Sequence, residues 1–250
     1  MSEKITVRRQ TRGTDPLAVS IVIPTYNESE TIGSVVKGAI AALSGYSFEV
    51  LVVDDSSPDQ TAQTVRREFE NDFRITVVER SSKQGRASAV VEGIERSEAD
   101  IVAVLDGDGQ HPPDVLPELF TNVNSGTCSV AVASRYRAGS AVQCSLPREA
   151  ISRASTRLAK MSCEQLRPLS DPLSGLFVAD KSCLFDIEIS GYGLKILPEV
   201  LAQVGSDAVI EVPYRFDRRA AGRSTVSLRT GVAFLHHILR VGRGNFGTVE

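Results

Sequence analysis

The stretch IVAVLDGDGQ, residues 101–110, combines a short apolar run with an acidic turn. The run Ile101–Leu105 has the length and composition of a buried strand, and Asp106, Asp108 and Gln110 follow it. Because these three residues alternate at a strand end, their side-chain oxygens can converge on one hard cation. Such a cation can also hold a diphosphate, so the stretch predicts a metal-dependent nucleotide-sugar site.

The same order of strand, polar loop and helix repeats on the N-terminal side of this stretch. Apolar runs at 18–23, 48–53 and 75–78 are each followed by a helical pattern, at 28–43, 61–69 and 87–95. This alternation predicts an α/β fold with a mostly parallel, doubly wound sheet and helices on both faces. Ligands of such sheets bind beyond the carboxyl ends of the strands. We therefore expect residues 24–28, 54–59 and 106–110 to meet at one edge.

The C-terminal part predicts shorter elements. A strand at 130–133 precedes a loop at 134–147, a basic helix at 148–160 and short strands at 176–179 and 209–212. In the last segment, 228–241, an apolar stripe is formed by Leu228, Val232, Leu235 and Leu239. This helix is expected to lie on a membrane surface or on the protein's own core. The chain then divides into a flexible extension (1–16), one catalytic domain (17–227) and an amphipathic C-terminal helix (228–250).

Composition favours a single large cytoplasmic domain. The chain has 250 residues, of which 42% are hydrophobic, enough for a full core. A net charge of only −3 gives no general attraction for nucleic acid, so an anion site has to be built from local cations. The four cysteines lack metal-site or disulfide spacing, and the N-terminus lacks the apolar segment of a signal peptide or anchor.

Several ordered motifs resemble the inverting family-two glycosyltransferases, and among them the dolichol-phosphate mannose synthase branch. They are PTYNE at 24–28, VDDSSPD at 53–59, the run at 106–113, SRY at 134–136, DPLSG at 171–175, GLKIL at 193–197 and F-x-x-R-x-x-G-x-S at 216–224. The resemblance implies a GT-A type nucleotide-binding fold, a GDP- or UDP-sugar donor and a polyprenyl phosphate acceptor. Mannose from GDP-mannose is the favoured donor, and UDP-glucose is the alternative. A non-catalytic nucleotide-binding scaffold subunit is a further alternative.

The resemblance and the residue chemistry together give a candidate donor site. Asp106, Asp108 and Gln110 are expected to hold Mg²⁺ or Mn²⁺, and Asp108 and Arg219 are the candidate catalytic residues. The donor-binding set is Pro24, Tyr26, Glu28, Asp54, Asp55, Gly85, Asp106, Gly107, Asp108, Arg219 and Ser224.

Six residues of the donor set have expected contacts with the donor. The resemblance places Tyr26 at the base and Arg219 with Ser224 in a lid over the diphosphate. The carboxylates Glu28, Asp54 and Asp55 would accept hydrogen bonds from base or ribose. For Glu28 the alternative is a helix cap, and for Asp54 a turn that binds backbone amides. Arg86 is either a cation of this pocket or solvated, and His111 is expected beside the metal ligands rather than among them.

The acceptor argument depends on the basic helix. A polyprenyl phosphate is anionic at neutral pH, so its oxygen can attack the sugar carbon without a general base and needs only cations to place it. Arg148 and Ser152 share a helix face, and Arg135 follows the preceding strand. Guanidinium groups suit phosphate. We expect these three residues to bind the acceptor phosphate, whereas solvation is favoured for Arg153 and Lys160.

The chain also departs from the family pattern. It has no tryptophan before the acceptor helix, Thr225 stands where a lysine is usual, and no run of 18 apolar residues follows Ser227. The lipid is therefore expected to be met peripherally at the cytosolic membrane surface, through a membrane partner subunit, or through segments absent from this chain.

Overall fold

The computed structural model describes residues 16–144, 146–185, 187, 189, 195–217 and 228–244. Its central sheet has seven strands in the order β3-β2-β1-β4-β7-β5-β8. Their bounds are β1 (Val19–Thr25), β2 (Phe48–Asp54), β3 (Ile75–Glu79), β4 (Ile101–Leu105), β5 (Val130–Ser134), β7 (Leu176–Asp180) and β8 (Val209–Pro213). All pairings are parallel except those of β7, which runs antiparallel between β4 and β5. The predicted mostly parallel α/β fold is confirmed.

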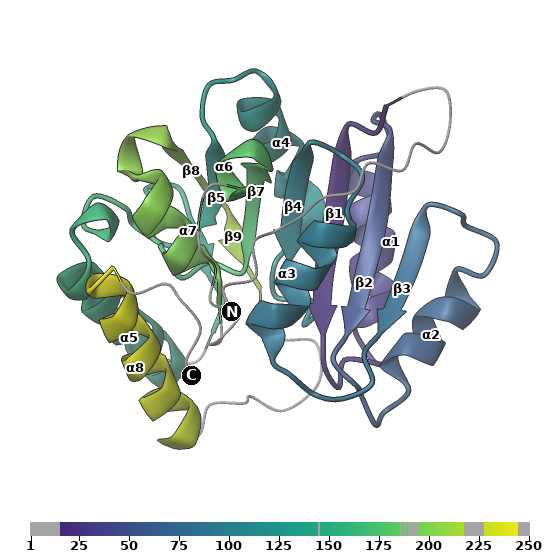
Figure 1. The fold of residues 1–250 in the computed structure, drawn as a ribbon, viewed down its shortest axis with the longest axis horizontal. Helices are drawn as coiled ribbons and strands as arrows, with labels where there is room; N and C mark the ends of the chain where they lie inside the picture. Colours follow the sequence, from purple (N-terminus) through teal and green to yellow (C-terminus); the bar gives the residue numbers. More distant parts are fainter. Residues whose placement is uncertain are drawn as a thin grey trace.

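Helices cover both faces of this sheet (Figure 1). One face is covered by α1 (Ile32–Ala42), α2 (Thr61–Glu68) and α4 (Leu116–Asn124). The other is covered by α3 (Arg86–Arg96), α5 (Leu146–Ser162), α6 (Ser182–Phe185), α7 (Leu197–Val204) and α8 (Leu228–Gly242). Short 3₁₀ helices span Pro113–Val115, Glu164–Leu166 and Ser206–Ala208.

Alternate residues of each central strand enter opposite cores. In β1, Ile21 and Ile23 belong to the α1 side, whereas Val22 belongs to the α3 side. Both faces are buried, which is why the strands appear in the sequence as continuous apolar runs. Gly93 of α3 lies so close to β1 that a Cβ there would overlap the side chain of Val22.

The structure differs from the predicted elements mainly in short or terminal segments. The helix expected from residue 28 begins at Ile32, because residues 28–31 form a turn tied to the acidic motif by a 2.9 Å hydrogen bond from Thr31 Oγ1 to Gly107 O. The predicted loop 134–147 contains β6 (Ala141–Val142), which pairs with β9 (Arg215–Phe216) after the strand expected to be last. Two-residue strands carry no periodic signal, so these were missed, as were α4 and α7.

Of the predicted apolar stripe of α8, the two residues whose burial is described, Leu235 and Leu239, face solvent, and other apolar residues of the helix enter the core. Ile238 and Val241 are buried, whereas Leu235 and Leu239 are 44% and 43% exposed. The helix packs beside α5, since a Cβ on Gly242 would overlap Ser162. Within the described ranges, no helix combines the length and apolar character needed to cross a bilayer.

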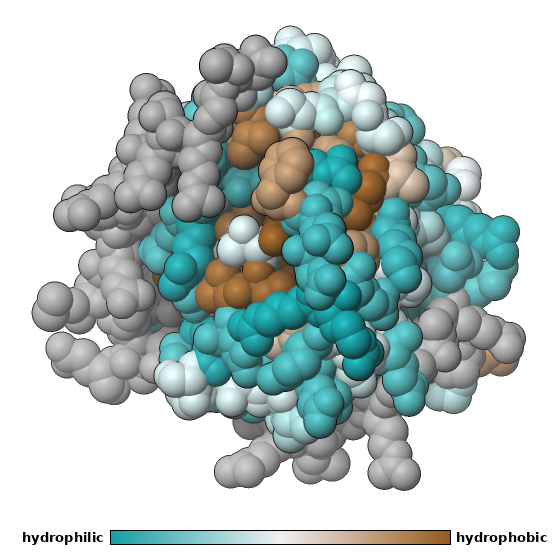
Figure 2. Space-filling view, turned by 90° about the vertical axis from the view of Figure 1, so that its right-hand side faces the viewer, coloured by the Kyte–Doolittle hydropathy of each residue, from teal (hydrophilic) through white to brown (hydrophobic). Residues whose placement is uncertain are grey.

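Exposed apolar side chains gather at the α5–α8 end of the molecule. Besides the two leucines of α8, the α5 residues Leu146, Ile151, Leu158 and Met161 are exposed. In Figure 1 these helices lie at the opposite end from α2 and β3. Figure 2 shows the α2–β3 end, where hydrophilic residues dominate and hydrophobic residues form small separate areas. At this end Phe73, between α2 and β3, is 96% exposed.

Candidate active site

The candidate site lies at the carboxyl ends of β1, β2 and β4, where β1 separates β2 from β4 (Figure 1). The three segments predicted to meet here are brought together by the sheet. Asp55 N–H donates to Thr25 O at 3.0 Å, and a Cβ on Gly107 would collide with the Glu28 carboxylate. Pro24 is the penultimate residue of β1, paired in register with Val53.

The centre of the site is a buried cluster of acidic and basic side chains. Glu28, Asp106 and Asp108 are all buried. Arg86, the first residue of α3, places Nη1 3.0 Å from Asp106 Oδ2 and Nη2 3.7 Å from Glu28 Oε1. Lys195 places Nζ 3.8 Å from the same oxygen of Asp106. Among the described residues, two cations thus lie beside the three carboxylates, an arrangement that attracts a further cation.

Burial and neighbouring charge set the protonation of this cluster. Burial raises the pKa of Glu28 to about 7, against the opposing charge of Arg86. Burial would also raise the pKa of Asp106, but the charges of Arg86 and Lys195 outweigh it and lower that pKa to about 2. Burial lowers the pKa of Lys195, and Asp106 opposes this effect. Asp106 is therefore ionised at neutral pH, while Glu28 is close to its midpoint.

His111 lies behind Asp106. Burial lowers its pKa to about 4, so the ring is neutral at pH 7. Its Nδ1 lies 2.8 Å from the Tyr214 hydroxyl, and its Nε2 lies 3.8 Å from Asp106 Oδ2. Gly175 completes this contact, because a Cβ there would overlap both Asp106 and His111. The glycine of the DPLSG motif therefore lets β7 approach the acidic motif.

The donor atoms of the acidic motif fit a hard divalent cation. Asp106, Asp108 and Gln110 offer only oxygen ligands, as Mg²⁺ and Mn²⁺ prefer. Gln110 Oε1 accepts a hydrogen bond from Arg148 Nη2 at 2.5 Å, and Gln110 N–H donates to Asp108 Oδ1 at 3.1 Å. In the part of the chain that the structure describes, no three His, Cys, Asp or Glu side chains form a metal-binding group. A cation here would need phosphate oxygens to complete its shell, as is usual for Mg²⁺.

Asp55 positions the start of α3. Its carboxylate accepts hydrogen bonds from Gln84 N–H and Gly85 N–H, both at 2.8 Å, and from Arg80 Nη1 at 2.9 Å. Gly85 has φ +103°, which favours glycine, and the helix begins at the next residue. Asp55 and Gly85 therefore place Arg86 beside Asp106.

Two other predicted donor residues have clear local partners. Lys83 Nζ lies 3.5 Å from the centroid of the Tyr26 ring, so the two side chains form a cation–π contact just beyond the end of β1. Asp54 accepts hydrogen bonds from Ser57 N–H at 2.9 Å and Ser57 Oγ at 2.5 Å. Burial raises the pKa of Asp54 and these hydrogen bonds oppose the effect. Asp54 thus binds the backbone amide and hydroxyl of Ser57 in a turn, which was the predicted alternative to a hydrogen bond with the donor.

Of the three predicted acceptor residues, Arg148 contacts the acidic motif, whereas Ser152 and Arg135 both contact Tyr136. Arg148 contacts Gln110 directly. Ser152 Oγ accepts a hydrogen bond from the Tyr136 hydroxyl at 2.7 Å, and the Arg135 guanidinium lies 5.2 Å from the Tyr136 ring centroid. Arg135 itself forms a paired ion contact with Asp171, with Nε–Oδ2 and Nη2–Oδ1 distances of 2.7 Å.

The outcome for the remaining site residues is mixed. Arg219 and Ser224 lie outside the described residues, as does the predicted extension apart from residue 16. Lys195, half-buried beside Asp106, and Asp171, buried against Arg135, are charged residues that were predicted only as parts of motifs. The motifs GLKIL and DPLSG were the available signal, but a sequence does not show which of their residues turn inward.

A mostly parallel sheet whose strand ends carry buried carboxylates, faced by cations, is the arrangement expected of a nucleotide-sugar-dependent transferase. The chain belongs to glycosyltransferase family 2. The family model described as Glycosyl transferase family 2 matches residues 20–183.

Similar proteins agree with this assignment. A dolichol-phosphate mannosyltransferase of Pyrococcus furiosus is 35% identical over 227 residues, which cover 90% of this chain and 64% of the relative. A dolichol-phosphate mannosyltransferase of Mycosarcoma maydis is 29% identical over 242 residues, covering 92% and 81%. The chain thus spans less than two thirds of the Pyrococcus relative. Glucosyl-3-phosphoglycerate synthase from Mycobacterium tuberculosis, solved with Mn²⁺, UDP and glucosyl-3-phosphoglycerate, has the same fold, with a TM-score of 0.68, 22% identity, and coverage of 94% and 81%.

Proposed function

We propose that this chain transfers a hexose from a nucleoside diphosphate sugar to a polyprenyl phosphate. Mannose from GDP-mannose, passed to dolichyl phosphate with inversion, is the favoured reaction. The observation that carries the proposal is the 2.5 Å hydrogen bond between Arg148 and Gln110, which joins the candidate acceptor helix to the acidic motif. The names of the Pyrococcus and Mycosarcoma relatives support the choice of acceptor.

In this reaction the acceptor needs placement rather than activation. Its phosphate oxygen already carries charge, so Arg148, with Ser152 one turn further along α5, would bind it in line with the sugar carbon. Arg135, fixed by Asp171, adds positive charge beside Tyr136. A single direct displacement at that carbon gives inversion.

The donor diphosphate would lie over the acidic cluster. Asp106, Asp108 and Gln110 would hold Mg²⁺ or Mn²⁺, which when bound stabilises the negative charge of the leaving diphosphate. Arg86 and Lys195 belong to the chain itself and face Asp106 from two sides. They would keep this carboxylate ionised and moderate the repulsion between the cluster and the phosphates.

We also propose that the chain works at the cytosolic surface of a membrane. The exposed leucines of α8 and the exposed apolar residues of α5 lie on adjacent helices and would enter the interfacial region. A membrane partner subunit that covers the same side chains is the alternative.

The reaction is tested with the purified chain, dolichyl phosphate, and radiolabelled GDP-mannose or UDP-glucose in parallel, with Mg²⁺, Mn²⁺ or a chelator. Metal-dependent label in the organic phase from GDP-mannose is the expected result. Label from UDP-glucose alone would replace mannose by glucose. Label from neither donor, even with detergent-solubilised lipid, would favour the non-catalytic scaffold.

A further inference from the structure

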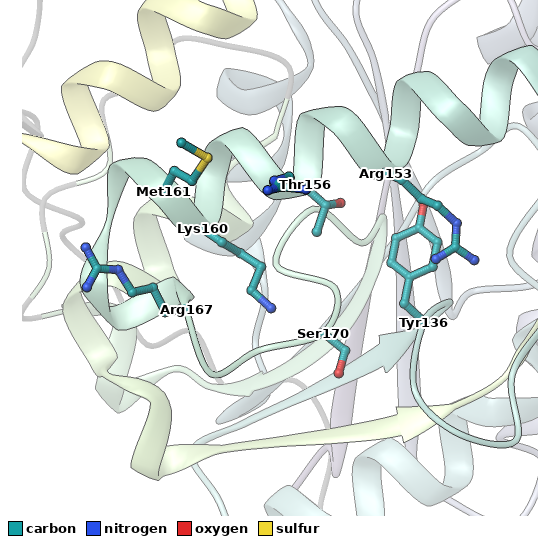
Figure 3. A pocket seen from close by; sticks show the side chains of 8 residues that line it. Tyr136, Arg153, Thr156, Lys160, Met161, Arg167 and Ser170 are labelled. Carbon is teal, nitrogen blue, oxygen red and sulfur yellow. The ribbon is translucent and has the colours of Figure 1, made fainter.

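A cavity of about 620 Å³, distinct from the candidate active site, lies between α5 and the segment that follows the 3₁₀ helix Glu164–Leu166 (Figure 3). Eight residues line it, of which four are cationic and none is acidic. Its volume suits a small organic molecule rather than a single ion.

The cations of this cavity belong to two segments, and Figure 3 shows the Arg167 side chain extending away from Lys160. Arg153, Arg157 and Lys160 are four and three residues apart, so they share one face of α5, and Arg167 belongs to the opposite segment. Arg153 pairs with Glu149 at 2.9 Å. Among the residues that the structure describes, no carboxylate lies within ion-pair distance of the other three. Positive charges that lack counter-ions around one cavity attract an anion.

Thr156 provides an independent sign of a ligand. Figure 3 shows its side chain pointing from α5 toward the space between Lys160 and Tyr136. Thr156 is 6% exposed, and its Oγ1 has no hydrogen-bond partner in the described part of the chain. Buried hydroxyls are nearly always hydrogen bonded. The oxygen is itself buried, so an acceptor atom of a ligand would satisfy it after the Thr156 side chain rotates toward the cavity.

The cavity also has apolar walls. The Tyr136 ring forms one side and is held by its hydroxyl contact with Ser152 and by the Arg153 guanidinium, 4.7 Å from the ring centroid. Met161 also borders the cavity and is 67% exposed. Behind the cavity, Glu211 fixes the facing segment by accepting a hydrogen bond from Ser170 N–H at 2.8 Å.

We propose that this cavity binds a phosphate monoester. The phosphate would bind to Lys160, with the Arg167 side chain and the Thr156 hydroxyl turning toward it, and the attached carbon skeleton would lie against Tyr136. A soluble organic phosphate and an anionic lipid headgroup carry the same group, so both are candidate sources. The cavity adjoins the proposed acceptor site, because Tyr136 lines it and bonds to Ser152, but neither Arg148 nor Ser152 lines it, and the proposal does not depend on the transfer reaction.

The sequence allows a specific measurement of this site. The chain has two methionines, Met1 and Met161, so methionine labelled with ¹³C at its methyl group places a reporter at the cavity. The full chain, free of metal, is titrated with glycerol 3-phosphate and, separately, with dihexanoyl phosphatidic acid below its micelle concentration. Met161→Leu assigns the signal. Protection of Lys160 from acetylation, measured by mass spectrometry, is the second readout.

We expect a saturable shift of the Met161 signal together with protection of Lys160. Lys160→Gln/Arg167→Gln should weaken binding by at least about tenfold. Arg66→Gln/Arg67→Gln removes the same charge from α2, at the other end of the molecule, and should leave binding unchanged. Thr156→Val keeps the side-chain shape and should weaken binding with the fold intact, so the test stands even if the double variant unfolds.

The two ligands distinguish the sources. Tighter binding of the phosphatidic acid assigns the cavity to a lipid headgroup, and equal or tighter binding of glycerol 3-phosphate assigns it to a soluble ester. The proposal is overturned if neither ligand shifts Met161 or protects Lys160, or if Thr156→Val and the double variant, both folded, bind as tightly as the original chain.

Discussion

Arg86 Nη1 lies 3.0 Å from Asp106 Oδ2, so the first residue of α3 supplies the cation nearest to the first carboxylate of the acidic motif. This contact depends on Gly85 and Asp55, which fix the turn before the helix. The same carboxylate is approached by His111, from the same loop, and by Lys195, from a segment more distant in sequence. A divalent cation that binds here would therefore enter a site whose charge is already partly balanced.

Asp108→Ala should reduce sugar transfer at least about 100-fold, because it removes an oxygen ligand from the proposed cation. The fold should persist, since no strand or helix depends on this side chain. Initial rates at saturating Mn²⁺, with a thermal melt, check the prediction. Asp114→Ala, an exposed carboxylate in the following turn, is the matched control. Full activity in the Asp108 variant would remove the metal assignment.

Glu28 should make stability fall as pH rises. Its pKa is raised by burial from 4.5 to about 7, so between these values the folded state binds more protons than the unfolded state. The stabilisation is complete below about pH 4.5 and is lost as pH approaches 7, a change of about 3 kcal/mol. Urea unfolding from pH 4 to 8, without metal, measures it. Glu28→Gln should flatten the profile, and an unchanged slope in that variant would contradict the assignment.

Asp171→Asn should lower the free energy of unfolding by roughly 3 kcal/mol, because it leaves the Arg135 guanidinium buried without its charge partner. Asp171 has 0% exposure, and although burial raises its pKa, Arg135 outweighs this and lowers it. Glu79→Gln breaks the exposed pair with Arg66 and should change stability by less than about 1 kcal/mol. Equal losses of unfolding free energy in the two variants would show that the buried Asp171–Arg135 pair stabilises the fold no more than the exposed pair.

Arg148→Ala should raise the KM for the polyprenyl phosphate about tenfold or more and leave nucleotide affinity within about twofold. Arg67→Ala on α2 removes one charge far from the site and serves as the control. Steady-state kinetics with each substrate varied, together with calorimetric nucleotide binding, separates the two effects. A loss confined to nucleotide affinity would place Arg148 in the donor site instead.

Leu235→Ser/Leu239→Ser should weaken binding to lipid vesicles without lowering the melting temperature, because both leucines face outward. Ile238→Ser on the same helix should lower the melting temperature by several degrees, since Ile238 is buried. Vesicle sedimentation and thermal melts measure the two responses. Vesicle binding that is unaffected by the double change would assign these leucines to a protein partner.

Much of the central sheet follows from the sequence because its strands are buried on both faces. Runs such as Val19–Thr25 and Ile101–Leu105 have to be apolar throughout, and the polar residues that follow them have to lie at one edge. The loop motifs identified the family. In the loops, Gly85 stands where the backbone has a positive φ, and Gly175 stands where it approaches Asp106 and His111 closely.

Other features depend on contacts between distant segments, which periodicity does not record. Only the folded chain shows that Lys195 reaches Asp106, that Asp55 fixes the Gly85 turn, and that Arg135 is paired with Asp171. Periodicity also predicted one apolar stripe on α8, whereas packing against α5 buries a different set of its residues.

The sequence by itself determined the α/β sheet, the family and the acidic motif, because burial on both faces and strand-end chemistry leave a local pattern in the residues. The tertiary structure alone decided which charges pair within the site and which side chains of α5 and α8 face solvent. It also formed the cavity that contains Thr156. These outcomes depend on which segments the sheet brings together, and no local stretch of residues carries that information.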